Sequence, residues 1–282
     1  MPLFLFIVVN VQSILDILQE IAPLDLAQSW DNVGLLVGNP AGQVSSILLA
    51  LDPTTALLAK AEQCNAELII THHPALFRPL KSLRSDCPTE KFLFAAVQAG
   101  LHVIGCHTNL DAACGGVNDV LAQLLYLQKT VPLLPDRRAD STEDCGQKTG
   151  LGRIGILAEP VLPEFFLQQL ERAISPPWLL EAGPRPDTVG KVAVCGGSCS
   201  DVSAKALEAG ADVFLTSEVK HDIARWAEEA GLWLLDGGHF ATEYPAMEGL
   251  RQLLVARLKM SAMDVHVQCV QQEPPLRLVR AR

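Results

Sequence analysis

The stretch AELIITHHP, residues 66–74, decides the fold class of this chain. Its short run of apolar residues is typical of a buried strand, and the run ends at two adjacent histidines. A similar apolar run lies at 45–51, and a helix is predicted between the two over 53–64, with Asp52 as its cap and Pro53 at its first position. A further helix around 90–99 precedes a third apolar run at 101–106. This alternation predicts an α/β fold, with a mainly parallel sheet and helices on its faces.

The second half of the chain repeats the alternation after an irregular segment. Residues 128–150 contain prolines, glycines and a cluster of charges, which predicts a connection between two lobes. We therefore expect a first α/β lobe over 1–127 and a second over 151–282, with a final edge strand at 264–269 that can pack on the first lobe. Further strands are expected at 151–158, 192–195, 211–216 and 232–236. Further helices are expected at 11–21, 163–174, 203–209 and 246–259.

The two halves are similar in sequence at an offset of 145 residues. Five of the thirteen positions at 59–71 are identical to their counterparts at 204–216. An Ala-Gly-Leu triplet precedes a predicted strand in each half, at 99–101 and 230–232, and each of these strands is followed by a His-x-x-x-acid motif. We infer that the two lobes descend from one duplicated α/β unit.

The composition argues against several classes of function. At 282 residues with 49% hydrophobic residues, the chain can bury a large core. Its net charge of -10 argues against binding to nucleic acid or to anionic membranes. The apolar run at 3–9 is shorter than the roughly 20 residues of a membrane span, and Lys60 is the first basic residue, so a signal peptide is not expected. Residues 1–10 are expected to form a leading strand or an upstream extension.

The eight cysteines show no C-x-x-C pair and none of the dense spacing of a disulfide scaffold. Reduced thiols in a cytoplasmic protein are the simpler prediction.

Histidines and carboxylates follow the predicted strands, which favours a site with two metal ions. Ligands of open parallel sheets bind outside the carboxyl ends of the strands, so residues from two facing lobes would converge on one cleft. Imidazole and carboxylate ligands suit zinc, iron, manganese, nickel or cobalt. A carboxylate that bridges two ions about 3.5–4 Å apart would let them activate a shared water. The candidate ligands are His72, His73, Asp111, His239 and Glu243, and either Asp111 or Glu243 could bridge.

Several nearby residues keep more than one interpretation. His107 could be a ligand, could orient one, or could face the substrate, and Glu218 could be a base, a partner of a ligand or a helix cap. We take both as candidate catalytic residues that move protons. The glycine turn at 195–198 could bind an anion such as a substrate phosphate through its backbone N–H groups, or could be a plain turn. Cys195 is a weaker candidate as a nucleophile, because no histidine lies beside it in the sequence. The remaining histidines are expected to be structural: His102, His221 and His266.

Five motifs follow one another along nearly the whole chain. They are SWDNVGL at 29–35, THHP at 71–74, HTNLDA at 107–112, TSEVKH at 216–221 and GHFATE at 238–243. In these motifs the chain resembles the Nif-three-like family, which comprises dinuclear metal-binding proteins catalogued as GTP cyclohydrolase I type 2 homologues. The resemblance implies that two divalent ions per subunit are bound by His72, His73, Asp111, His239 and Glu243. It also implies a toroidal homohexamer whose sites face an internal cavity.

Two functions are compatible with these residues. The first is a metal-dependent hydrolase of a nucleotide or a related small molecule, and the resemblance suggests GTP ring opening. The second is a non-catalytic metal carrier, or an oligomeric hub that docks a partner. Both functions need the same ligands, so only a test of turnover separates them.

Overall fold

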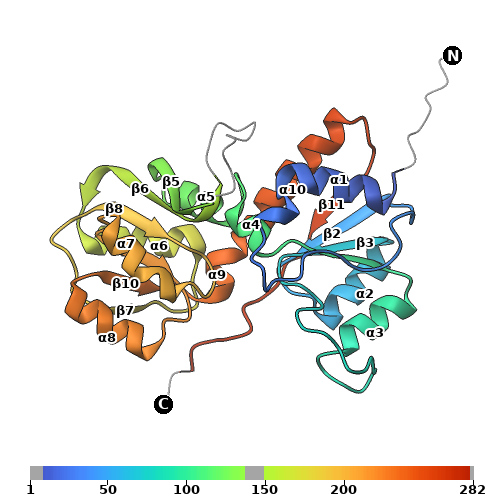
Figure 1. Cartoon of the computed structure of the whole chain (residues 1–282), viewed down its shortest axis with the longest axis horizontal. Helices are drawn as coiled ribbons and strands as arrows, with labels where there is room; N and C mark the ends of the chain where they lie inside the picture. The colour runs from blue at the N-terminus through green and yellow to red at the C-terminus, as the bar shows by residue number, and fades with distance from the viewer. Residues whose placement is uncertain (1–8, 137–148, 280–282) are drawn as a thin grey trace. The chain divides into compact units, whose positions relative to one another are not determined.

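The computed structural model describes residues 9–136 and 149–279, which form two compact units (Figure 1). The first unit contains the described chain up to Leu110 together with Met247–Gln272, and the second contains the described parts of Asp111–Ala246 and of the tail from Glu273. The division thus falls before residue 127, because helix α5 (Val117–Leu124) packs into the core of the second unit. Most of the expected N-terminal strand or extension lies outside the described residues.

The first unit is built on a five-stranded sheet with the order β1-β4-β3-β2-β11. Its strands are β1 (Gly34–Val37), β2 (Ser46–Ala50), β3 (Leu68–Thr71), β4 (His102–Gly105) and β11 (His266–Cys269). Strands β4, β3, β2 and β11 run parallel to one another, and β1 runs antiparallel to β4. The last strand of the chain therefore lies at a sheet edge, as the alternation at 264–269 predicted.

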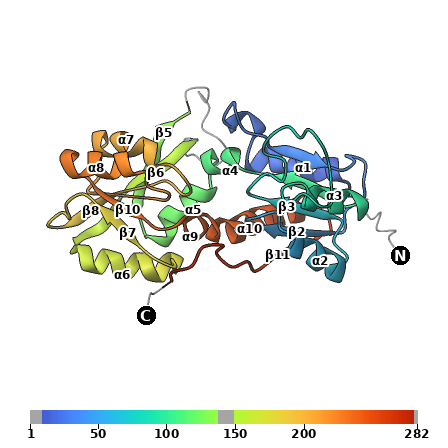
Figure 2. The same cartoon turned by 90° about the horizontal axis from the view of Figure 1, so that it is seen from below.

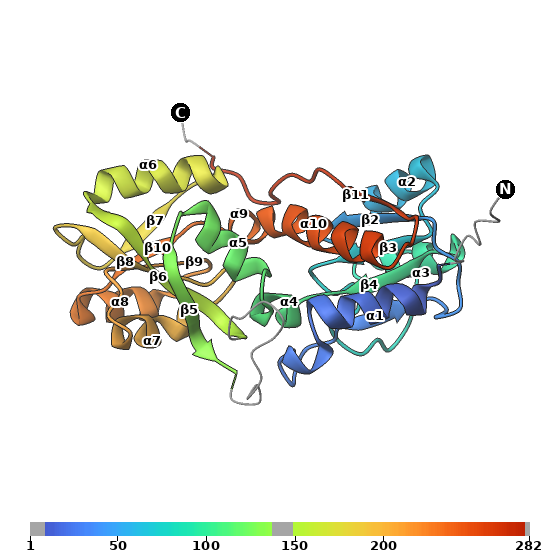
Figure 3. The same cartoon turned by 90° about the horizontal axis from the view of Figure 1, so that it is seen from above.

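Helices cover both faces of this sheet. They are α1 (Val11–Ile21), α2 (Thr55–Cys64), α3 (Lys91–Gln98) and α10 (Pro245–Met260), and a short 3-10 helix, η1, spans Leu24–Leu26. Side chains alternate between the faces of a strand, so Leu48 and Ala50 of β2 point to one face, where they pack with Leu57 of α2 and Phe92 of α3. Helices α1 and α10 lie side by side over the opposite face, as the view in Figure 3 shows.

The second unit contains a mixed six-stranded sheet with the order β5-β6-β8-β9-β10-β7. Its strands are β5 (Gln128–Pro135), β6 (Gly150–Val161), β7 (Leu180–Ala182), β8 (Val189–Val194), β9 (Val213–Thr216) and β10 (Trp233–Asp236). Strands β8, β9 and β10 are parallel, whereas the other three pairings are antiparallel. The prediction of a mainly parallel sheet is therefore wrong for this unit. Crossover helices produce parallel pairing between neighbouring strands. Helices join β8 to β9 and β9 to β10, whereas β6 and β7, which a helix also joins, are not neighbours in the sheet.

Strand β5 lies where a connection between lobes was predicted over 128–150. The prediction is wrong for Gln128–Pro135, which pairs antiparallel with β6. Pro132 and Pro135 suggested a loop, but β5 is an edge strand, where proline does not interrupt hydrogen bonding on both sides. Residues 137–148 of that segment lie outside the described residues.

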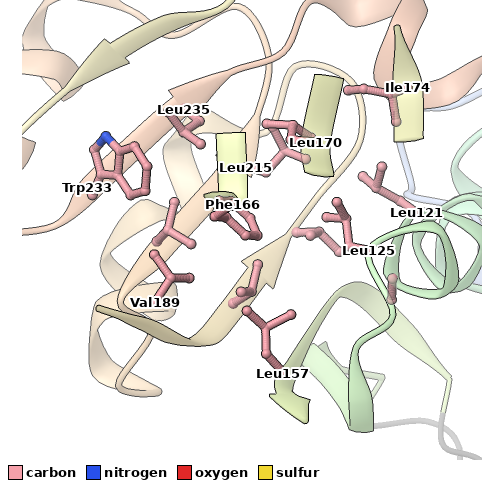
Figure 4. Close-up of a cluster of buried hydrophobic side chains, with 14 of the residues drawn as sticks. Leu121, Leu125, Leu157, Phe166, Leu170, Ile174, Val189, Leu215, Trp233 and Leu235 are labelled. Atoms are coloured by element: carbon pink, nitrogen blue, oxygen red, sulfur yellow. The ribbon is translucent and has the colours of Figure 1, made fainter. Parts of the chain in front are cut away.

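Two helical layers enclose the sheet of the second unit (Figure 2). The helices are α5, α6 (Pro163–Ile174), α7 (Ser203–Glu208) and α8 (His221–Ala230), with the 3-10 helix η2 (Ser200–Val202) and the five-residue helix α9 (His239–Glu243). The five-residue helix α4 (Thr108–Ala112) begins in the first unit and ends in the second. Leu121 of α5 and Phe166 of α6 join one buried cluster with Leu215 and Trp233 of the sheet (Figure 4). Helices α7 and α8 pack on the other face.

A buried arginine ties helix α5 to this sheet. Arg153 in β6 is 1% exposed, and all five of its N–H donors are used. Its Nε and Nη2 donate to the two carboxylate oxygens of Asp119 at 2.5 and 2.9 Å. The other donors bond the carbonyls of Ala113, Gly150 and Gly152 at 2.6–3.2 Å. Nothing in the local sequence distinguishes this buried arginine from a surface one.

No helix within the described residues is long and apolar enough to cross a membrane. Six cysteines in the described part of the chain carry free thiols, as expected, but Cys114 forms a disulfide. The expectation of reduced thiols is therefore wrong at this position, because cysteine pairing depends on spatial proximity and not on spacing along the sequence.

Candidate metal centre

Two of the predicted ligands lie where strand β3 ends in the first unit. The amides of His72 and His73 still donate to the carbonyls of Ala50 and Leu51 at 3.1 and 3.0 Å, and the Thr71 hydroxyl donates to the His73 carbonyl at 2.7 Å. Because the chain leaves regular strand geometry here, the two adjacent rings do not point to opposite faces. Their centroids are 5.1 Å apart.

His107 joins these two residues after strand β4. Its ring centroid lies 5.2 Å from that of His72 and 5.7 Å from that of His73. One ring nitrogen from each of the three histidines lies within 4.8 Å of the others. The sequence left three roles open for His107, and this geometry allows it to be a ligand. We call His72, His73 and His107 the histidine cluster.

Each histidine of this cluster is oriented through its Nδ1 atom. The Nδ1 of His73 lies 2.7 Å from Oδ1 of Asp52, that of His107 lies 2.8 Å from Oδ1 of Asp31, and that of His72 lies 2.8 Å from the Cys106 carbonyl. Carboxylates and carbonyls accept hydrogen bonds, so each Nδ1 carries the proton and each Nε2 presents the lone pair. Histidine ligands of metals are commonly held in this way.

The sequence analysis missed Asp31 and Asp52 as functional residues. Asp52 was expected to cap helix α2, but α2 begins at Thr55 and its N-cap, Thr54, makes no side-chain capping bond. Asp31 was noted only as part of a motif. The signal that could have found them is an aspartate inside a motif, for Asp31, and an aspartate directly after a predicted strand, for Asp52. Their histidine partners lie 76 and 21 residues away in the sequence.

Asp31 is held as a carboxylate. Burial alone would raise the pKa of its carboxyl group, but hydrogen bonds from His107 and Thr108 outweigh burial and hold the pKa far below its ordinary value. The Thr108 amide donates to Oδ2 at 3.0 Å. An ionised Asp31 fixes the tautomer and the orientation of the His107 ring.

The second unit holds the other three predicted ligands. Asp111 lies in α4, and His239 and Glu243 lie one turn apart in α9, directly after strand β10. Nε2 of His239 is 3.0 Å from Oε2 of Glu243, and carboxylate oxygens of Asp111 and Glu243 lie within 4.8 Å of each other. We call these three residues the acidic cluster. Two buried carboxylates this close repel each other, so a bound cation would stabilise their arrangement.

Glu218 contacts the acidic cluster through His239. Its Oε1 lies 2.8 Å from Nδ1 of His239, while the side chain of Glu218 remains 58% exposed. The capping role is not observed, because α8 has Lys220 at its N-cap and no side-chain capping bond. Glu218 has a φ of 54°, a left-handed conformation that is uncommon outside glycine and often occurs at functional sites. Glu218 therefore orients His239 as Asp31 and Asp52 orient their histidines.

Backbone donors at the glycine turn, residues 195–198, are used within the protein, which favours a plain turn over an anion cradle. The amide of Gly196 donates to Oδ1 of Asn118 at 2.9 Å, that of Gly197 to the Thr242 hydroxyl at 3.1 Å, and that of Cys199 to the Gly197 carbonyl at 3.0 Å. These donors are used within the protein. The turn instead brings Gly197 against Glu243, since a Cβ atom on Gly197 would lie 2.1 Å from Oε1 of Glu243.

Cys195 is poorly suited to act as a nucleophile. It is fully buried, and its pKa is raised, first by a hydrogen bond with Cys199 and then by burial. A protonated thiol is a weak nucleophile.

The three histidines expected to be structural contribute to none of the metal-compatible groups found among the described residues. His102 packs against Gly38 and Gly42 and accepts a hydrogen bond from the Asn39 amide at 3.3 Å. His221 and His266 are exposed at the starts of α8 and β11.

The comparisons with known proteins agree with the motifs and the geometry. Residues 9–275 match the model of the family described as Duf34/NIF3 (NGG1p interacting factor 3). The chain belongs to the Duf34/NIF3 family. It is 30% identical over 249 residues to a Clostridium perfringens protein named GTP cyclohydrolase 1 type 2 homolog, and the alignment covers 88% of this chain and 92% of that protein.

Solved structures of other Duf34/NIF3 proteins share the fold. A Bacillus cereus protein related to NIF3 is similar with a TM-score of 0.89 and 24% identity, covering 97% of this chain and all (100%) of that one. A hypothetical protein of Staphylococcus aureus is similar with a TM-score of 0.88 and 26% identity, covering 96% of this chain and 99% of that one.

Proposed function

We propose that the residues of the histidine cluster and of the acidic cluster bind divalent metal ions, two per chain, and that the chain is a metal-dependent hydrolase of a nucleotide or a related small molecule. One observation carries the metal proposal: Nδ1 is held by an oxygen acceptor in all four histidines of the two clusters. This arrangement makes Nε2 the atom through which each of the four histidines would bind a metal ion. Such nitrogen and carboxylate ligands fit zinc, iron, manganese, nickel or cobalt. His72, His73, Asp111, His239 and Glu243 are the proposed ligands, and His107 is a sixth candidate.

The position of the clusters in the fold supports the same proposal. His72, His73 and His107 follow β3 and β4, and His239 follows β10, so both clusters lie after the carboxyl ends of parallel strands. We infer that the two parallel triplets, β2-β3-β4 and β8-β9-β10, derive from one duplicated unit, and that each copy supplies ligands after its strands.

Bound metal ions would lower the pKa of water and stabilise the negative charge that develops on a substrate. The residues of the chain would supply proton transfer. Glu218 can accept a proton at Oε2, because Oε1 holds His239 and more than half of the side chain is exposed. His107, whose Nδ1 atom is held by Asp31, can act at its Nε2 atom if it is not itself a ligand. GTP is the first substrate to test, because the similar Clostridium perfringens protein is named a GTP cyclohydrolase homolog.

Metal content is the first test of this function. We expect about two first-row ions per chain, measured by inductively coupled plasma mass spectrometry on protein purified without a His tag. His73→Ala should lower the content through the histidine cluster and His239→Ala through the acidic cluster. His266→Ala is the control, because that exposed histidine lies outside both clusters. Full metal content in both cluster variants, or no metal after anaerobic reconstitution, would contradict the proposal.

Turnover separates a hydrolase from a metal carrier. Glu243→Gln should abolish hydrolysis by the metal-loaded protein, whereas Glu248→Gln should leave it unchanged, because Glu248 is half-exposed and pairs with Arg251. A metal-loaded protein that hydrolyses none of a broad set of nucleotides would favour the carrier or hub.

Asp52 should set the metal affinity of His73. Asp52→Ala is expected to weaken metal binding by about 10- to 100-fold, because the His73 ring loses its orienting acceptor. Asp52→Asn should have an intermediate effect, since an amide oxygen keeps the hydrogen bond but not the charge. Competition with a fluorescent chelator measures both affinities. Asp86→Ala, which removes an exposed carboxylate paired with Arg84, is the matched control, and equal affinities in all three variants would show that Asp52 has no such role.

A further inference from the structure

Two large aromatic side chains are exposed in the first unit. Trp30 is 59% exposed and Phe77 is 44% exposed. Their ring centroids are 5.9 Å apart with an interplanar angle of 75°, so the rings form an open corner. Aromatic rings of this size usually bury most of their surface, and an exposed pair in contact often marks a binding site.

The aromatic pair borders the histidine cluster. The centroids of Trp30 and Phe77 each lie 6.1 Å from the ring of His107. The His107 ring in turn contacts His72 and His73. A ligand that stacks on the pair would therefore lie next to the histidine cluster. Phe165 is also exposed, but it has no such neighbour among the ring contacts of the described residues.

Hydrogen bonds on either side hold the pair in position. Asp31, which follows Trp30, is anchored by His107 and Thr108, and its amide donates to the Gln28 carbonyl at 2.9 Å. The Asn32 side-chain amide donates to the carbonyl of Leu76, the residue before Phe77, at 2.5 Å. The segments that carry the two rings are thus bonded to each other. A surface fixed before binding loses less conformational entropy when a ligand binds.

Two basic residues follow Phe77 in the sequence. Arg78 is adjacent to Phe77 and Lys81 lies three residues further, and both are exposed. Arg84 pairs with Asp86, whereas neither Arg78 nor Lys81 has a carboxylate partner within the part of the chain that the structure describes. Two cations that follow an aromatic corner in the sequence are notable in a chain with a net charge of -10. They favour an anionic ligand over a neutral one.

We propose that Trp30 and Phe77 form a stacking subsite for the planar heteroaromatic ring of a nucleoside phosphate, and that Arg78 and Lys81 attract its phosphate. This inference rests on the proposed function, because it names the class of substrate that would be presented to the histidine cluster. Trp30 and Phe77 are specificity-determining residues in this view. Stacking on an aromatic ring accepts any base, so the subsite selects bases as a class and the remaining contacts select among them.

The test measures ligand binding to the full chain after the metal has been removed by dialysis against a chelator, so that its outcome does not depend on metal or turnover. Isothermal titration calorimetry with guanosine monophosphate should give saturable binding, with weaker binding of ribose 5-phosphate, which lacks the base. Trp30→Ala should weaken guanosine monophosphate binding by about tenfold to hundredfold. Trp30→Phe should retain most of the affinity.

Two further variants test the phosphate contact and the specificity of the effect at Trp30. Arg78→Ala should weaken binding of guanosine monophosphate but not of guanosine. Phe165→Ala removes a ring of the second unit that is 59% exposed, like Trp30, and should change the affinity for neither guanosine monophosphate nor guanosine. Unchanged affinity in Trp30→Ala, or equal binding of ribose 5-phosphate and guanosine monophosphate, would overturn the stacking subsite even if metal binding and hydrolysis were established. A change in oligomeric state in Trp30→Ala by light scattering, with no change in affinity, would overturn it in favour of a contact between copies of the chain.

Discussion

Replacing Arg153 with methionine is expected to lower the free energy of unfolding of the second unit by about 3–5 kcal/mol. Methionine can occupy a similar volume, so the loss comes from hydrogen bonding and charge. The substitution leaves the Asp119 carboxylate buried without its cation, and it removes the donors for three carbonyls, those of Ala113, Gly150 and Gly152. Buried acceptors that lose their donors carry an additional desolvation penalty.

Urea titration can isolate the second unit. In a Trp30→Phe background the remaining tryptophans, Trp178, Trp226 and Trp233, all belong to that unit, so fluorescence reports its unfolding alone. Arg225→Met is the matched control, because Arg225 forms an exposed i,i+3 pair with Glu228 and should contribute less than about 1 kcal/mol. Equal midpoints for Arg153→Met and Arg225→Met would show that the buried network does not stabilise the unit.

Gly197→Ala is expected to reduce metal affinity by about 100-fold although no proposed ligand is changed. The new Cβ would lie 2.1 Å from Oε1 of Glu243, which is too close for both atoms to keep their positions, and 3.6 Å from Nε2 of His239. The carboxylate would have to move away from its neighbours. Gly197 also has a φ of +72°, so alanine adds about 1–2 kcal/mol of backbone strain.

Gly231→Ala separates backbone strain from displacement of Glu243. Gly231 has a similar φ of +76° in the same unit, and a Cβ there meets no atom within 4 Å. Both variants should lose comparable backbone stability, but only Gly197→Ala should lose metal, as measured by chelator competition. Shortening the displaced side chain in Gly197→Ala/Glu243→Asp should restore part of the affinity. Similar metal content in the two alanine variants would mean that the Glu243 carboxylate is not held where the structure has it.

The strands that carry the metal-candidate residues were predictable because their signals are local. Apolar runs at 45–51, 66–71, 101–106, 211–216 and 232–236 correspond to β2, β3, β4, β9 and β10 within one or two residues. Burial on both faces of a sheet makes such strands continuously apolar, and the helices between them have their own periodicity. The positions of the histidines at the carboxyl ends followed directly from these strands.

Strand β5 was not predictable in the same way. Its prolines are compatible with a strand only at a sheet edge, and edge position is decided by strand order, which no local pattern specifies. The role of the glycine turn at 195–198 could not be predicted from local sequence either, because two of its backbone donors bond to Asn118 and Thr242, which are distant in sequence.

Local sequence patterns specified which elements form and which strand ends carry histidines and carboxylates, and five motifs carry the resemblance to one family. These signals could be read from the sequence because hydrophobic periodicity and motifs involve neighbouring residues. The tertiary structure was needed to show that His107 joins His72 and His73. It also showed that three carboxylates orient histidines, those of Asp31, Asp52 and Glu218. The burial of Arg153 with Asp119 likewise appears only in the folded chain. These contacts join residues separated by 21 to 76 positions. The hydrogen bonds that tune a site form between side chains that strand order and register bring together, and that proximity is a property of the folded chain.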